Sequence, residues 1–357
     1  MLKKINVVVV DDSAFMRKYI SAMLESDNEI KVIASAKNGA EGYELVKKLK
    51  PDLVTMDIEM PVMDGLTALQ KIMKDCPVPV LMVSSLTTEG ADATIKALEY
   101  GAIDVIPKEM SYFHVDIEKI KEELIGKIKE IVRNISLSNK LIKISQLKNI
   151  QTKPTVKSGL INSLPKINYS AIAIGVSTGG PLSLQKVLPF LSSGIKIPLF
   201  LVQHMPPRFT KSLAERLNGM CELTVKEAEN NEKVQNGYVY IAPGGYHMTL
   251  KKKLNDLPTI SIDEVPSDTL HRPSVDIMMN SVIDLFGKNT LGIIMTGMGK
   301  DGFEAIKKLK SIGGYCIAQN EESCVVYGMP RAIAEAGYAD VIAPLESISE
   351  IINKAVL

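Results

Sequence analysis

Short apolar runs alternate with amphipathic stretches along most of this chain. In the first 110 residues, runs rich in Val, Ile, Leu and Met predict strands at 5–10, 30–35, 52–56, 79–84 and 103–106. The stretches between them have apolar residues at helical spacing; the first carries Met16, Ile20, Met23 and Leu24. Strands that are apolar throughout and alternate with helices indicate a parallel sheet covered by helices on both faces.

The same alternation returns from residue 170 to the end of the sequence. Apolar runs predict strands at 171–176, 197–203, 238–242, 291–296, 314–318 and 340–343. Helical spacing predicts helices at 181–191, 208–218, 273–286, 301–311 and 329–337. The pattern therefore predicts an α/β protein with two doubly wound parallel-sheet domains, the second Rossmann-like, and no internal repeat relates one to the other.

A polar stretch separates the two halves. An amphipathic helix is predicted at 117–135, and the sequence then becomes rich in Lys, Ser, Asn, Gln and Thr up to residue 168. We place the first domain at 1–127, a linker at 128–167 and the second domain at 168–357. The helical rhythm continues toward residue 150, so the start of the linker is the softest of these boundaries.

Composition narrows the function classes. With 46% hydrophobic residues, 23% charged residues and a net charge of +1, the chain gives no support to nucleic-acid binding, which usually needs a basic face. Its longest apolar runs have the length of strands, which argues against direct membrane insertion. Its four cysteines lack metal-ligand spacing and its start lacks a cleavage signal, so we expect a cytoplasmic protein. We also expect a monomer.

Polar side chains follow four strands of the first half. They are Asp11 and Asp12, Asp57, Ser84 and Lys108. Parallel strands end at one edge of the sheet, so the three carboxylates should repel one another unless a divalent cation lies among them, and oxygen ligands suit Mg²⁺. Such a site could accept a phosphoryl group on a carboxylate while the metal and the lysine neutralise its oxygens.

These residues lie in segments that resemble a two-component receiver domain: VVDDS at 9–13, MDIEMPVMDG at 56–65, MVSS at 82–85 and GAIDVIPK at 101–108. The resemblance implies a flavodoxin-like fold with Asp57 as phosphoacceptor. It implies direct Mg²⁺ ligation by Asp12, Asp57 and the Glu59 carbonyl, with Asp11 acting through water. By the same resemblance, Ser84 meets the phosphoryl group and Lys108 pairs with it.

Two positions depart from the usual receiver pattern. Pro107 precedes Lys108, whereas family members usually have a proline after the lysine. Val105 stands where an aromatic switch residue is common. We therefore expect a phosphoryl lifetime or switching response unlike the family norm.

In the second half, Ser177 follows the apolar strand at 171–176 and begins a glycine-rich turn. A serine on a sharp strand-to-helix turn is placed as a nucleophile is, although a phosphate cradle or a plain turn has the same pattern. His204 ends the next strand, and Asp301 follows another strand through a glycine-rich loop, where capping a helix at 301–311 is its simplest role. A serine, a histidine and a carboxylate are the parts of a serine triad. Their order along the chain differs from that of α/β-hydrolases.

Six segments resemble chemotaxis protein-glutamate methylesterases: GVSTGGP at 175–181, QHMP at 203–206, APGGYH at 242–247, HRPSVD at 271–276, TGMGKDG at 296–302 and AQNEESCVVYGMP at 318–330. With the receiver, the match covers nearly the whole chain outside the linker. The resemblance implies a Ser177–His204–Asp301 triad. It makes the Met298 backbone a candidate oxyanion donor and gives Thr178 a supporting role toward the histidine or the substrate.

The implied reaction is hydrolysis of glutamyl methyl esters on the cytoplasmic helices of chemoreceptors, giving glutamate and methanol. Deamidation of selected receptor glutamines follows from the same acyl chemistry. A chemotaxis histidine kinase would phosphorylate the receiver, Mg²⁺ would be its cofactor, and the ester chemistry would need none. The unphosphorylated receiver would obstruct access to Ser177.

Three other interpretations fit parts of this pattern. A non-catalytic interaction protein predicts that Ser177 does not react with an acylating probe. A DNA-binding response regulator is disfavoured by the near-neutral charge. A serine hydrolase or deacylase acting on another substrate shares the same chemistry, and the resemblance favours the methylesterase.

Overall fold

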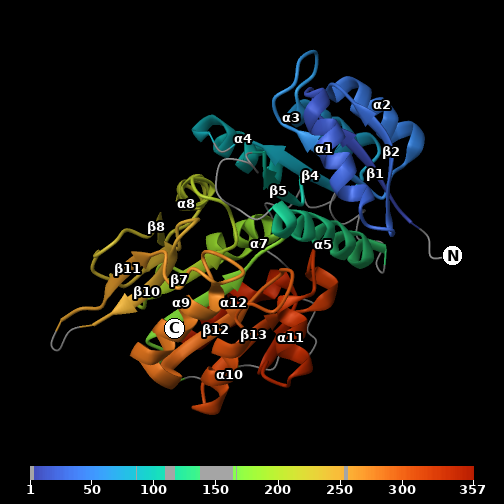
Figure 1. Cartoon of the computed structure of the whole chain (residues 1–357). Coiled ribbons are helices and arrows are strands. Elements are labelled where there is room, and N and C mark those ends of the chain that lie inside the picture. Colours follow the sequence, from blue (N-terminus) through green and yellow to red (C-terminus); the bar gives the residue numbers. More distant parts are fainter. Residues whose placement is uncertain (1–3, 86, 109–116, 137–163, 166, 253–255) are drawn as a thin grey trace. The chain divides into compact units, whose positions relative to one another are not determined.

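The computed structural model describes residues 4–85, 87–108, 117–136, 164–165, 167–252 and 256–357, and divides into two compact units, 1–153 and 154–357 (Figure 1). Helix α5 (Ile117–Ser136) runs across the boundary that we placed after residue 127. Of the expected linker, residues 137–163 and 166 lie outside the described residues. The limits 1–127, 128–167 and 168–357 therefore stay predictions, and each unit is described by itself.

The first unit is a five-stranded parallel sheet in the order β2-β1-β3-β4-β5. Its strands are β1 (Ile5–Val10), β2 (Ile30–Ala36), β3 (Leu53–Asp57), β4 (Val80–Ser84) and β5 (Asp104–Pro107). Its other helices are α1 (Ala14–Glu25), α2 (Gly39–Leu49), α3 (Gly65–Asp75) and α4 (Thr88–Glu99). This strand order is that of flavodoxin-like folds, so the predicted fold is confirmed.

Polar residues in the loops after the strands cap the helices of the first unit. The side chains of Ser13, Asn38, Asp64 and Thr87 accept hydrogen bonds from the first turns of α1, α2, α3 and α4. These caps satisfy backbone N–H groups that have no partner within the helix. Each capped helix therefore starts at a defined residue, which fixes where the loops after Asp11 and Asp57 end.

The second unit contains a seven-stranded parallel sheet in the order β14-β13-β12-β6-β7-β9-β8. Its strands are β6 (Ala171–Val176), β7 (Leu199–Gln203), β8 (Thr224–Glu227), β9 (Tyr238–Ile241), β12 (Thr290–Ile294), β13 (Tyr315–Gln319) and β14 (Val341–Ala343). Its helices are α7 (Gly180–Val187), α8 (Phe209–Asn218), α9 (Val275–Phe286), α10 (Phe303–Ser311), α11 (Met329–Glu335) and α12 (Leu345–Val356). Residues of α9, α10 and α11 share one buried core with the sheet, among them Met278, Ile306, Ile333 and Phe200.

The order of this sheet places a switch point between β6 and β12. After β6 the chain builds outward through β7 on one side, and it later returns to build β12, β13 and β14 on the other. Ligand sites of open α/β sheets lie where the strand order reverses, beyond the carboxyl ends of the strands. Ser177 follows β6 directly and the loop with Asp301 follows β12, so both lie at this point.

Several elements were not expected. The antiparallel pair β10 (His247–Lys251) and β11 (Thr259–Asp263) forms a separate two-stranded sheet, and β8 lies at the edge of the large sheet. Strand β8 has the sequence TVKE, in which only Val225 is buried, so it lacks the apolar run of a central strand. Helix α12, which buries Ile348, Ile351 and Ile352, lies beyond the last predicted helix. The predicted helix at 181–191 ends as an α-helix at Val187 and continues as a 3₁₀ turn that contains Pro189.

None of the helices in the described ranges is long and apolar enough to cross a membrane.

Candidate functional site

In the first unit, Asp11, Asp12 and Asp57 come together at the carboxyl edge of the sheet. Each offers an oxygen, and these oxygens all lie within 4.8 Å of one another. Asp11 and Asp57 are buried, whereas Asp12 is exposed. Burial raises the pKa of Asp57 to about 6, despite the opposing hydrogen bond from Lys108, and it raises the pKa of Asp11 as well. The edge therefore holds negative charge that the protein alone compensates only in part.

Lys108 is the cation at this edge. Its Nζ lies 2.5 Å from Asp57 Oδ2 and 3.4 Å from Asp11 Oδ2. The backbone N–H of Lys108 donates to the Ser84 carbonyl at 2.7 Å, which ties the loop after β5 to the end of β4. Asp57, the phosphoacceptor implied by the sequence, thus pairs with the lysine and lies beside the other two carboxylates.

These residues fit a hard divalent cation. Asp11 Oδ2 is buried and accepts no hydrogen bond, its described partner being the Lys108 ion pair. Three clustered carboxylates, of which Asp11 and Asp57 pair with the one lysine, leave an excess of two negative charges, and Mg²⁺ prefers carboxylate oxygens with room for water. Asp11, Asp12 and Asp57 are therefore the side chains that would hold the ion.

Ser84 and Glu59 lie beside this cluster and make hydrogen bonds to neighbouring residues. The Ser84 hydroxyl is buried and donates to the Gly90 carbonyl at 3.2 Å. The Glu59 N–H donates to Asp57 Oδ1 at 3.3 Å. Val105, at the aromatic switch position, is buried within β5. Contact of Ser84 with a phosphoryl group and ligation by the Glu59 carbonyl stay predictions.

In the second unit, the turn that carries Ser177 is built on glycine. Gly179 has a φ of 76°, which favours glycine, and α7 begins at Gly180 with a proline in its first turn. A Cβ on Gly180 would lie 1.9 Å from Gln203 Oε1. Gln203 is fully buried, and its Nε2 donates to the carbonyls of both Ser177 and His204 at 3.0 Å. This glutamine therefore ties the ends of β6 and β7 together.

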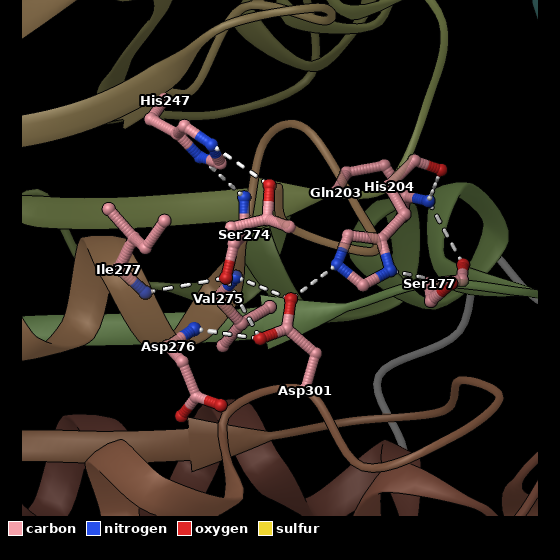
Figure 2. A network of polar contacts seen from close by, with 10 residues as sticks. Ser177, Gln203, His204, His247, Ser274, Val275, Asp276, Ile277 and Asp301 are labelled. Atoms are coloured by element: carbon pink, nitrogen blue, oxygen red, sulfur yellow. Dashed lines mark hydrogen bonds and ion pairs between the residues drawn. The ribbon is translucent and has the colours of Figure 1, made fainter. Parts of the chain in front are cut away.

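His204 joins Ser177 to Asp301. Its Nδ1 lies 3.1 Å from Ser177 Oγ and its Nε2 lies 2.8 Å from Asp301 Oδ2 (Figure 2). An ionised carboxylate can only accept, so the proton belongs on Nε2 and Nδ1 is free to accept from the serine hydroxyl. The two ring nitrogens exchange the positions that they have in chymotrypsin-like triads, but their tasks are the same. Ser177 is 6% exposed, so the contact is largely shielded from water.

Asp301 is held by the start of α9 rather than by its own helix. Helix α10 begins at Phe303 after Gly302 and has no side-chain cap, so the expected capping of a helix at 301–311 is wrong. Asp301 Oδ2 instead accepts from the Val275 N–H at 2.7 Å, and Oδ1 accepts from the Asp276 N–H at 2.9 Å. Burial favours the neutral acid, but the His204 contact and these N–H groups outweigh it and hold the pKa of Asp301 well below its usual range.

The two aspartates cap each other's helices. Asp276, in the first turn of α9, accepts from the Ala305 N–H of α10 at 2.7 Å, while Asp301, just before α10, accepts from the first turn of α9. Each carboxylate satisfies backbone N–H groups that otherwise lack partners. This exchange fixes the loop of Asp301 against α9.

Several residues of this site were missed in the sequence. Ser274 donates from its hydroxyl to Asp301 Oδ1 at 3.0 Å, and the His271 ring stacks on His204 at a centroid distance of 4.2 Å. His247 is fully buried and accepts from the Ser274 N–H at 3.2 Å. In the segment HRPSVD, a serine stands just before an apolar helical run, which is typical of an N-cap. This pattern does not indicate that the serine hydroxyl also donates to Asp301.

Met298 and Thr178 lie next to the serine. A Cβ on Gly297 would lie 2.8 Å from Ser177 Cβ, so the loop after β12 approaches Ser177 at the residue before Met298. Thr178 Oγ1 is buried and has no hydrogen-bond partner within the described part of the chain. Their roles as oxyanion donor and as support of the histidine or substrate stay predictions.

Comparison with known proteins gives matches to both units. Residues 172–352 match the family model described as CheB methylesterase, and residues 7–116 match the response regulator receiver domain. A protein of Pyrococcus horikoshii named protein-glutamate methylesterase/protein-glutamine glutaminase is 45% identical over 100% of this chain and 95% of its own length. A protein of that name from Lawsonia intracellularis is 47% identical over 98% of both chains.

A solved structure resembles the second unit. The crystal structure of the Thermotoga maritima CheB methylesterase catalytic domain is 44% identical, with a TM-score of 0.51, and the match covers 53% of this chain and 99% of that one. The α/β fold with two parallel sheets agrees with the predicted fold class.

Proposed function

Because this chain belongs to the CheB methylesterase family and carries a response regulator receiver domain, we propose that it hydrolyses glutamyl methyl esters on chemoreceptors. We propose that it also deamidates selected receptor glutamines, as the names of its relatives suggest for those proteins. The observation that carries the proposal is the continuous chain of contacts from Ser177 Oγ through both nitrogens of His204 to Asp301.

The chemistry follows from that chain. His204 Nδ1 takes the hydroxyl proton as Ser177 Oγ attacks the ester carbonyl, and Asp301 stabilises the imidazolium through the Nε2 hydrogen bond. The imidazolium then returns the proton to the leaving group, giving methanol from an ester or ammonia from an amide. Water hydrolyses the acyl-enzyme by the same steps in reverse, and glutamate is the product in both cases.

The N–H of Met298 is the proposed donor to the oxyanion, since the loop after β12 closes against Ser177 through Gly297. The buried Thr178 hydroxyl is the proposed support of the histidine or the substrate.

We propose that the first unit regulates this reaction. Asp57 accepts a phosphoryl group from a chemotaxis histidine kinase, and Lys108, 2.5 Å from its carboxylate, then pairs with the phosphoryl oxygens. Asp11, Asp12 and Asp57 would hold Mg²⁺, which would supply positive charge to those oxygens. Phosphorylation thereby raises methylesterase activity, which gives adaptation in chemotaxis.

The direct test is methanol release from methylated receptor membranes, measured with and without a phosphodonor. The proposal expects release by the wild-type chain and a higher rate with the phosphodonor. No release in either condition would reject the methylesterase in favour of a hydrolase or deacylase with another substrate, or of a non-catalytic protein.

Asp301→Asn should reduce kcat by about 10⁴-fold while the protein stays folded. The asparagine amide can donate to His204 Nε2, which moves the imidazole proton to Nδ1, where it can no longer accept from Ser177. Steady-state methanol release checks the rate, and thermal unfolding checks the fold. A folded variant with near-normal kcat would show that the carboxylate does not set the tautomer.

The segment 168–357 alone should hydrolyse receptor esters faster than the unphosphorylated full-length chain. If the receiver favours an obstructed state by about 1.4 kcal/mol, only about one molecule in ten is open, and its removal gives up to about a tenfold gain. Both proteins are compared at equal concentration on methylated receptor membranes. A folded segment with an equal or lower rate would contradict obstruction and leave delivery to the receptor or kinase as the receiver's role.

A further inference from the structure

The carboxylate of Asp301 is anchored at both oxygens. Oδ2 accepts from His204 Nε2 and from the Val275 N–H, and Oδ1 accepts from the Asp276 N–H and from the Ser274 hydroxyl (Figure 2). The two backbone donors belong to the start of α9. Ser274 is the one side-chain donor besides the imidazole among the described contacts of this carboxylate.

The Ser274 hydroxyl has a defined direction. Its oxygen accepts from the Ile277 N–H at 3.4 Å, so its own hydrogen is available to Asp301 Oδ1 at 3.0 Å. An ionised carboxylate cannot donate, which makes the hydroxyl the donor. The residue is buried, and water therefore cannot easily replace this bond.

Ser274 is itself fixed from behind by His247. The Ser274 N–H donates to His247 Nδ1 at 3.2 Å, so the proton of that imidazole lies on Nε2, which donates to the Pro266 carbonyl at 3.1 Å. His247 is fully buried, and its burial lowers the pKa of its imidazole, which keeps the ring in this neutral form. The line of contacts thus runs from His247 through Ser274 and Asp301 to His204.

We propose that Ser274, backed by His247, is a positioning residue of the triad: its hydroxyl anchors Asp301 Oδ1 so that Oδ2 stays directed at His204 Nε2. The inference rests on the proposed acyl chemistry and adds a residue that would act through Asp301. A hydrogen bond to a charged group is stronger than one between neutral groups, and a buried carboxylate that loses it can rotate away from its imidazole.

Capping of α9 and positioning of Asp301 make different demands on this residue. A cap needs an acceptor for the Ile277 N–H, and glycine costs a helix start only a few tenths of a kcal/mol relative to serine. Positioning needs a donor toward Asp301. Ser274→Gly keeps a tolerable cap without the donor, Ser274→Asp keeps a good cap but faces Asp301 with a second carboxylate, and Ser274→Thr keeps the hydroxyl.

Methanol release from methylated receptor membranes and thermal unfolding are measured for the three full-length variants. Ser274→Gly should lower kcat about tenfold to a hundredfold, with KM and the unfolding midpoint little changed. Ser274→Asp should lower kcat further, and Ser274→Thr should restore most of the kcat that the glycine variant loses. Normal kcat in a folded Ser274→Gly protein would overturn the proposal.

A double-mutant cycle separates positioning from general destabilisation. If Ser274 acts through Asp301, Ser274→Gly should change kcat little when Asp301 is already asparagine. An equal loss of kcat in both backgrounds would overturn the proposal. Additive effects would mean that Ser274→Gly lowers kcat independently of Asp301.

The reaction of Ser177 with a fluorophosphonate probe gives a second readout that needs no receptor. If wild-type protein releases no methanol, the proposed function fails, but the probe still reports whether Ser274→Gly slows the serine. If wild-type protein is active and the glycine variant reacts normally in both assays, only the role of Ser274 fails.

Discussion

Ser177→Ala should abolish ester hydrolysis and leave the fold intact, with a loss in kcat of about 10⁶-fold, as for the nucleophile of other serine triads. The variant lacks the oxygen that forms the acyl-enzyme. Its backbone contacts stay, including the Ser177 N–H bond to the Thr296 carbonyl at 2.9 Å and the Gln203 bond to the Ser177 carbonyl. Methanol release from methylated receptor membranes measures the effect.

Ser193→Ala is the matched control, because it removes a hydroxyl from an exposed loop of the same unit. It should keep the wild-type rate. Comparable unfolding midpoints for both variants would show that the loss belongs to the chemistry. A folded Ser177→Ala protein that still releases methanol at a near-normal rate would remove Ser177 from the mechanism, and the glycine-rich turn would then need another role.

Asp57→Asn should eliminate Mg²⁺-dependent labelling by acetyl phosphate, since an amide cannot form an acyl phosphate. The neutral side chain also removes one of the three clustered carboxylates, so Mg²⁺ should bind more weakly. Labelling is followed with radioactive phosphodonor, with and without a chelator.

Asp92→Asn, on the exposed surface of α4, is the control and should be labelled like the wild type. Labelling that survives in the Asp57 variant would place the acceptor elsewhere. The lifetime of the label in the wild type also tests the expected effect of Pro107 and Val105.

Strand ends could be predicted from the sequence because buried parallel strands are apolar throughout and polar side chains interrupt them abruptly. Ser177, His204, Asp11 and Asp57 each stand at such an interruption, and the structure brings each of them to the edge of a sheet. The edge strand β8 lacks this change from apolar to polar residues, because only part of its surface is buried.

The surroundings of Asp301 could not be predicted in the same way. An aspartate before a helix is typical of a cap, and the sequence does not tell which helix it caps. The partner is α9, whose start lies 26 residues earlier along the chain. The roles of Ser274 and His247 depend on the same packing of α9 against the loop after β12, so they became visible only in three dimensions.

Because Asp276 and Asp301 each cap the other's helix, Asp301 contributes to the fold as well as to the proposed triad. A gene copy released from selection for catalysis can lose Ser177 without disturbing its neighbours, whereas loss of Asp301 also strips two N–H groups of α9 of their acceptor. Descendants that have become pure binding proteins should therefore shed the serine first and retain the aspartate. In a relative that lacks the serine, an aspartate at this position would reflect its contacts with α9 and would not indicate esterase activity.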